Sequence, residues 1–251
     1  MFAKFSHAAS KRVACAALLS GALCALGVSQ SPTLSSLFQE AFDDDLVGAT
    51  TANLAVSNKL VITNTTGSIV GTITGDRSSL FVVPSLDGVG NTLRLADRAS
   101  GVIGYAAVQF TPSVLSPTMS RFNASFVLTP VDDGTTAFTC GIIDNEVTPG
   151  SGRIAKLTFL PNRKLALNDK AIPASYEIGH RYAIELSTTK VGPVWMWGVS
   201  ILDLTTNAPI YMDVGLAPDD LTATPATLML STSDPGRGTF DIDSVELSGT
   251  P

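Results

Sequence analysis

The chain closes with a segment in which apolar residues alternate with carboxylates, Gly238-Thr239-Phe240-Asp241-Ile242-Asp243-Ser244-Val245-Glu246-Leu247. A second acid-rich segment, residues 38–45, stands near the beginning of the chain. Short runs with the same apolar–polar alternation fill the sequence between them. A period of two with one polar face is typical of half-buried antiparallel strands. We therefore expect an all-β fold in which the first and last strands meet.

The alternation is clearest in residues 121–128, where Phe122, Ala124, Phe126 and Leu128 share one face. Further strands are predicted at 59–62, 68–74, 80–83, 92–95, 105–110, 155–159, 182–186 and 227–230. Turn residues such as Asp87-Gly88 separate these runs. Many short strands at this spacing indicate a sandwich or barrel. We expect a two-sheet antiparallel sandwich that uses residues 37–249 as a single domain.

The N-terminal region has the layout of a secretory signal peptide. Lys4, Lys11 and Arg12 form a positive segment, and residues 13–26 carry no charge. The apolar run is short for a membrane span, and no second such run follows. We predict a signal peptide over 1–27, a short linker over 28–36, and a mature chain without a membrane span. The expected location is secreted, periplasmic or at the cell surface.

Composition excludes some classes of partner. Charged residues make up 15% of the chain, the formal net charge is −6, and the lysines and arginines are scattered singly. A nucleic-acid partner requires a basic patch, so none is expected. Cys15 and Cys24 would leave with the signal peptide, so Cys140 would remain without an internal disulfide partner. Its alternation with threonine predicts a small buried residue on a strand.

Three passages carry a resemblance to a known family. The chain opens with Glu40-Ala41-Phe42-Asp43, continues with a strand–hairpin passage ending at residues 176–184, and closes with Phe240-x-Ile242-Asp243-x-Val245-x-Leu247. Together they resemble the concanavalin A-like lectin/glucanase (laminin-G-like) jelly-roll domains of exported bacterial proteins. The resemblance implies a jelly-roll sandwich. Domains of this family serve as lectins, carbohydrate-binding modules, glycanases, lyases and adhesive modules, so fold alone does not select a function.

The resemblance also implies a structural Ca²⁺ ion, because several carbohydrate-binding jelly rolls bind one between their first and last strands. Glu40 and Asp43 would supply one side of this site, and Asp241 and Asp243 the other. Carboxylate oxygens are the ligands that Ca²⁺ prefers. Asp241 and Asp243 are two residues apart and point to the same face of their strand. In the alternative interpretation, these acids simply face water.

The two tryptophans of the chain, Trp195 and Trp197, project to the same side of one predicted strand. Aromatic rings can stack on the apolar faces of sugars while the indole N–H donates a hydrogen bond. The pair is therefore a candidate glycan-binding platform. The stripe continues into Val199 and Ile201, however, and this continuation favours a place in the core.

No catalytic constellation is predicted. The Glu-x-Asp-x-x-Glu string of laminarinase-like members is absent; Asp144-Asn145-Glu146 comes closest and is typical of a turn. His180 is interpreted as an exposed turn histidine. We expect an exported, non-catalytic module whose partner is a polysaccharide or glycoconjugate outside the cell or on its surface. A polysaccharide hydrolase or lyase with a divergent site is one alternative, and a structural matrix or surface-assembly protein is another.

Overall fold

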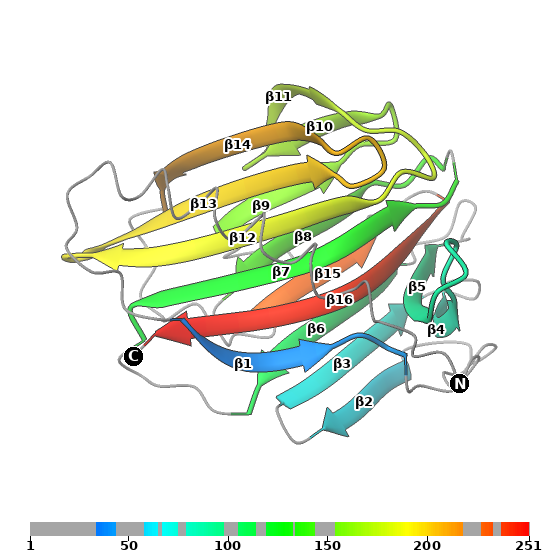
Figure 1. The fold of residues 1–251 in the computed structure, drawn as a ribbon, viewed down its shortest axis with the longest axis horizontal. Helices are drawn as coiled ribbons and strands as arrows, with labels where there is room; N and C mark the ends of the chain where they lie inside the picture. The colour runs from blue at the N-terminus through cyan, green and yellow to red at the C-terminus, as the bar shows by residue number, and fades with distance from the viewer. Residues whose placement is uncertain are drawn as a thin grey trace, which may run out of the picture. The chain divides into compact units, whose positions relative to one another are not determined.

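Strands are the regular elements that the structure describes, and they pair into two antiparallel sheets (Figure 1). The structure is a computed structural model. It describes residues 34–43, 58–64, 67–74, 79–97, 105–113, 119–132, 134–143, 154–217, 227–232 and 237–250. All of them belong to the second of the chain's two compact units, residues 34–251. The predicted signal peptide, Cys15, Cys24 and Asp144-Asn145-Glu146 lie outside the described residues.

The first sheet contains eight of the described strands. Its order is β14 (Ala208–Leu216), β13 (Val194–Asp203), β12 (Tyr182–Val191), β7 (Arg121–Pro130), β16 (Gly238–Thr250), β5 (Asn91–Asp97) and β4 (Ser79–Pro84), and β1 (Ser35–Glu40) also pairs with β16. The long strand β16 lies along β7 over most of its length. On its other side, β16 pairs with β5 through residues 238–242 and with β1 through residues 245–249.

The second sheet also contains eight of the described strands. Its order is β11 (Lys170–Ser175), β10 (Lys164–Leu167), β9 (Ile154–Phe159), β8 (Phe138–Ile143), β15 (Thr227–Thr232), β6 (Tyr105–Pro112), β3 (Gly67–Thr74) and β2 (Asn58–Asn64). Its strands lie behind the first sheet in the view of Figure 1. The prediction of an all-β, two-sheet antiparallel sandwich is therefore confirmed.

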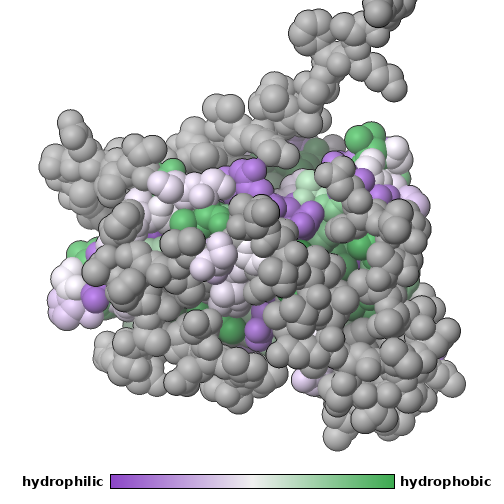
Figure 2. All heavy atoms as spheres, turned by 90° about the horizontal axis from the view of Figure 1, so that it is seen from below, coloured by the Kyte–Doolittle hydropathy of each residue, from purple (hydrophilic) through white to green (hydrophobic). Residues whose placement is uncertain are grey.

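The core lies between the two sheets and follows the predicted alternation. Phe122 and Phe126 of β7 are buried, and so are Leu228 and Leu230 of β15 in the second sheet. Cys140 is also fully buried and has no disulfide bond. Burial of this apolar surface is the main favourable contribution to the folding free energy. Figure 2 shows hydrophilic and hydrophobic residues interspersed where the described part of the surface is in view.

The first and last described strands meet, as the sequence predicted, because β1 pairs antiparallel with β16. It begins at Ser35, two residues before the expected start of the domain. Phe38 of β1 points into the core, and its ring centroid lies 6.0 Å from that of Phe110 in β6. Phe42 contacts the same ring edge-on at 6.4 Å. The opening segment is thus attached to both sheets.

Within the described residues, no helix is long and apolar enough to cross a membrane.

Replacing Phe38 by alanine should reduce the free energy of unfolding by about 3–5 kcal/mol, because the change leaves a cavity beside Phe110. Urea unfolding of the full chain measures this difference. Leu86→Ala is the matched control: Leu86 is 59% exposed, so its truncation should change stability by less than about 0.5 kcal/mol. Equal effects of the two substitutions would contradict the position of β1 in the sandwich.

Candidate functional site

Polar side chains cover the outward side of three central strands in the first sheet, β12, β7 and β16. Because the side chains of a strand alternate between its two faces, the residues between the core positions all point away from the second sheet. We call this surface the outer polar face, and it consists of Glu185, Ser187, Arg121, Asn123, Ser125, Glu246 and Ser248.

The register of the strands arranges these residues in rows. Ser125 lies directly opposite Glu185 of β12 on one side and Glu246 of β16 on the other. In the next row, Asn123 lies between Ser187 and Ser248. Directly opposed residues in antiparallel strands point to the same face. Two spacings between strands place the Cα atoms of Glu185 and Glu246 about 10 Å apart, with a small serine between them.

Two polar atoms of this face are buried without a hydrogen-bond partner in the part of the chain that the structure describes: Oδ1 of Asn123 and Nε of Arg121. Asn123 is only 7% exposed, and its Nδ2 donates to Oε1 of Glu185 at 3.4 Å. Buried polar atoms in folded proteins nearly always have a partner, and an exception calls for an explanation. The outer polar face therefore retains one unused acceptor and one unused donor.

Glu185 is the residue of this face whose ionisation is most perturbed. Its pKa is raised from 4.5 to about 7, mainly by burial; the charge of Arg121 opposes the shift, and the charge of Glu246 adds to it. A carboxylate with a full complement of donors would have a lowered pKa. The shift has this direction because the cost of burying the charged carboxylate outweighs the attraction of Arg121.

The sign of this shift fixes its effect on stability. The folded chain holds the proton of Glu185 more tightly than the unfolded chain does. Its contribution to stability is therefore complete below pH 4.5 and is lost as the pH rises through about 7.

An ion pair lies at the end of the first sheet next to the outer polar face. Nε and Nη2 of Arg94 on β5 each lie 2.7 Å from a carboxylate oxygen of Asp241 on β16. Asp241 is 2% exposed, and burial raises its pKa although Arg94 opposes the shift. The hydrogen bond with Asp241 in turn raises the pKa of Arg94. This bidentate pair ties β5 to β16.

A second arginine holds the neighbouring acids. Arg181, just before β12, pairs with Asp87 in the β4–β5 hairpin and lies 3.4 Å from Asp243 of β16. Burial raises the pKa of Asp243, and the charge of Asp43 raises it further. Asp43 also accepts a hydrogen bond from the backbone N–H of Asn91 at 3.2 Å.

The four acids predicted to bind calcium therefore each have another partner. Glu40 accepts the backbone N–H of Phe42 at 2.8 Å, and the partners of the others are Asn91, Arg94 and Arg181. A Ca²⁺ ion would have to displace Arg94 from Asp241, so the residues as placed do not fit the expected set of ligands. Within the described residues, no three His, Cys, Asp or Glu side chains are grouped to hold a metal ion.

The tryptophans lie on the other side of the first sheet from the outer polar face. Trp195 is 6% exposed and packs with Ile154 and Ala217. Trp197 is half-buried, packs against the core, and donates its indole N–H to the carbonyl of Leu216 at 2.9 Å. Both positions agree with the core interpretation of the stripe. A glycan platform built on these rings stays a prediction.

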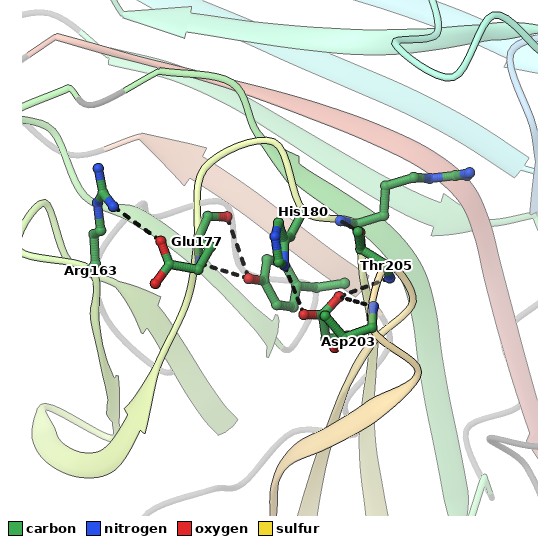
Figure 3. A network of polar contacts seen from close by, with 8 residues as sticks. Arg163, Glu177, His180, Asp203 and Thr205 are labelled. Atoms are coloured by element: carbon green, nitrogen blue, oxygen red, sulfur yellow. Dashed lines mark hydrogen bonds and ion pairs between the residues drawn. The ribbon is translucent and has the colours of Figure 1, made fainter.

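His180 belongs to a network at one end of β12 and β13, and it is not a freely exposed turn residue (Figure 3). Its Nδ1 lies 2.9 Å from Oδ2 of Asp203, while Oδ1 of Asp203 accepts the backbone N–H groups of Thr205 and Thr206. Burial alone would raise the pKa of Asp203, but these hydrogen bonds outweigh it and lower the pKa. The network connects the β11–β12 loop to the β13–β14 turn.

Sequence reasoning missed Glu185, Asn123 and Arg121 as site residues. Arg121 and Asn123 stand two residues apart on one predicted strand, and Glu185 lies 62 residues from Asn123. The one available signal was the alternation itself, because each of these residues occupies a polar position of a predicted strand. Their grouping depends on which strands are adjacent, and alternation does not determine that order.

No protein-family model matches the chain, and no curated protein matches it. Among solved structures, the chain is similar to lectin II from Ulex europaeus, with 11% identity, 86% of this chain and 100% of that chain covered, and a TM-score of 0.49. It is also similar to arcelin-5, a lectin-like defense protein from Phaseolus vulgaris, with 9% identity, 78% and 99% covered, and a TM-score of 0.48.

A third similar structure is a carbohydrate esterase from the Shiga toxin-encoding bacteriophage phi24B, with 8% identity, 87% and 100% covered, and a TM-score of 0.47. The two lectin structures and this one are each similar to the chain over more than three quarters of its length.

Arg94→Met should reduce the free energy of unfolding by about 3–5 kcal/mol at pH 7, because it leaves the buried charge of Asp241 without a partner. The double variant Arg94→Met/Asp241→Leu should recover most of this loss. Urea unfolding of the three proteins measures the effect. A loss below about 1 kcal/mol in the single variant would contradict the importance of this pair.

Proposed function

We propose that the chain is an exported β-sandwich protein that binds carbohydrate on its outer polar face. The signal-like N-terminal sequence supports export. The observation that carries the binding site is the buried Oδ1 of Asn123, which has no hydrogen-bond partner among the described residues. A bound hydroxyl group would supply the missing donor.

The chemistry of the outer polar face suits a ligand rich in hydroxyl groups. A sugar hydroxyl both donates and accepts, so it complements the acceptor of Asn123 and the donor Nε of Arg121. Glu185 and Glu246 add further acceptors on either side of Ser125. These residues lie on paired strands, which hold them in fixed relative positions and reduce the entropy cost of binding.

The side chains between the longer residues of this face are small. Ser125 lies between the two glutamates, and Ser187 lies beside Asn123. Gly198 of β13 follows Ser187 in the same row.

The test is to incubate the full chain with a panel of insoluble polysaccharides and to record protein depletion and newly formed reducing ends. The chain should be depleted by at least one polysaccharide. Ser125→Leu should weaken that binding by about tenfold or more, because the larger side chain fills the space between the glutamates. Gln109→Leu, on the outward side of the second sheet, is the matched control and should bind as wild type does.

Two further results have defined meanings. Trp197→Leu should retain binding; a folded variant that lost binding while Ser125→Leu retained it would return the site to the tryptophans. Release of reducing ends would favour the hydrolase alternative. Failure of every polysaccharide to deplete the chain would contradict the proposal.

A further inference from the structure

The outer polar face has an excess of acceptors over donors and an excess of negative charge. Arg94 neutralises Asp241, and Arg181 is shared between Asp87 and Asp243. Glu185 and Glu246 are the acids of the outer polar face itself, and Arg121 is a cation whose charge acts on Glu185. The two glutamates of this face therefore outnumber its one arginine.

The side chain of Asn123 indicates where a hydrogen-bond donor of a ligand would bind. Its Nδ2 is directed to Glu185, at 3.4 Å, which is long for a hydrogen bond to a carboxylate. Its buried Oδ1 accepts nothing from the described residues. Two neighbouring acceptors, one of them a carboxylate, thus share a place that lacks a donor.

We propose that the carbohydrate ligand carries a primary amine and that its ammonium group binds between Glu185 and Asn123. This inference rests on the proposed carbohydrate-binding function and specifies the class of sugar. An ammonium group presents three N–H donors and one positive charge, and it donates to both acceptors at once. The sugar hydroxyls then meet Nε of Arg121 and the carboxylate of Glu246 in the neighbouring rows.

Binding of the same amine would change the ionisation of Glu185. The groups that face this carboxyl are Arg121 and Asn123 from β7 and Glu246 from β16, while Ser200 of β13 opposes it without a charge. Arg121 alone does not offset the negative charge of Glu185, and a bound ammonium group supplies a second positive charge. Binding therefore lowers the pKa of Glu185 and releases its proton.

A metal cation fits the place less well. Ca²⁺ takes six to eight oxygen ligands at about 2.3–2.6 Å, whereas Glu185 and Asn123 offer three side-chain oxygens. The nearest further carboxylate, Glu246, lies two strands away.

The experiment is calorimetric titration of the full chain at pH 6 and low salt with two oligomers of equal length, β-1,4-linked glucosamine and β-1,4-linked N-acetylglucosamine. The glucosamine oligomer should bind at least about tenfold more tightly, since a charge-assisted hydrogen bond contributes about that factor or more. Glu185→Gln should remove this preference while leaving the fold intact, because glutamine has the shape of the protonated side chain.

The control variant is Glu177→Gln, which removes one negative charge at an exposed ion pair with Arg163 away from the outer polar face. It should keep the preference for glucosamine. Glu246→Gln is a second test of the face and should weaken binding of the glucosamine oligomer without altering the fold.

Each remaining outcome would overturn the inference. They are equal binding of the two oligomers, a preference that survives Glu185→Gln, and binding of polylysine as tight as that of the glucosamine oligomer, which would mean that charge alone suffices. If neutral polysaccharides bind the chain but the glucosamine oligomer binds no more tightly, the proposed carbohydrate binding is supported and the proposed amine site is wrong. If no carbohydrate binds at all, the proposed function itself fails.

Discussion

The structure depends on the pairing of its last strand. β16 lies along β7 on one side and divides its other side between β5 and β1. Its inward residues, such as Ile242 and Leu247, complete the core, so the same register that closes the sandwich also determines which residues face outward. Side chains alternate on either side of the irregularity between Asp243 and Glu246, so the order of the core and the order of the outer polar face are one constraint.

The charged side chains of the first sheet have closer partners near β5 than in the middle of the sheet. Arg94 and Arg181 hold Asp241 and Asp243, and these contacts stabilise the joint between the hairpin of β4 and β5 and strand β16. A few residues further along the strands, Glu185 and Asn123 lack comparable partners. Proteins generally pair their buried polar groups, so this contrast between neighbouring regions is the basis of the functional proposal.

Much of the fold could be predicted from local pattern, because alternation in residues 121–128 and in the closing strand directly reflects burial of every second side chain. The meeting of β1 and β16 was also predicted. The site could not be found in this way, because Glu185, Asn123 and Glu246 come together through strand order. The partners of Asp241 and His180 were missed for the same reason: Arg94 and Asp203 are distant in sequence and carry no motif.

The central claim is that the outer polar face holds hydrogen-bond acceptors that lack a donor in the free chain. The titration of Glu185 tests this claim most directly. The chemical shift of the Glu185 side-chain carboxyl carbon should be followed by NMR as a function of pH, with and without the glucosamine oligomer. The account predicts a midpoint near pH 7 for the free chain, as burial without a matching cation requires, and a lower midpoint when the oligomer is bound. A midpoint near 4.5 that the oligomer leaves unchanged would contradict it.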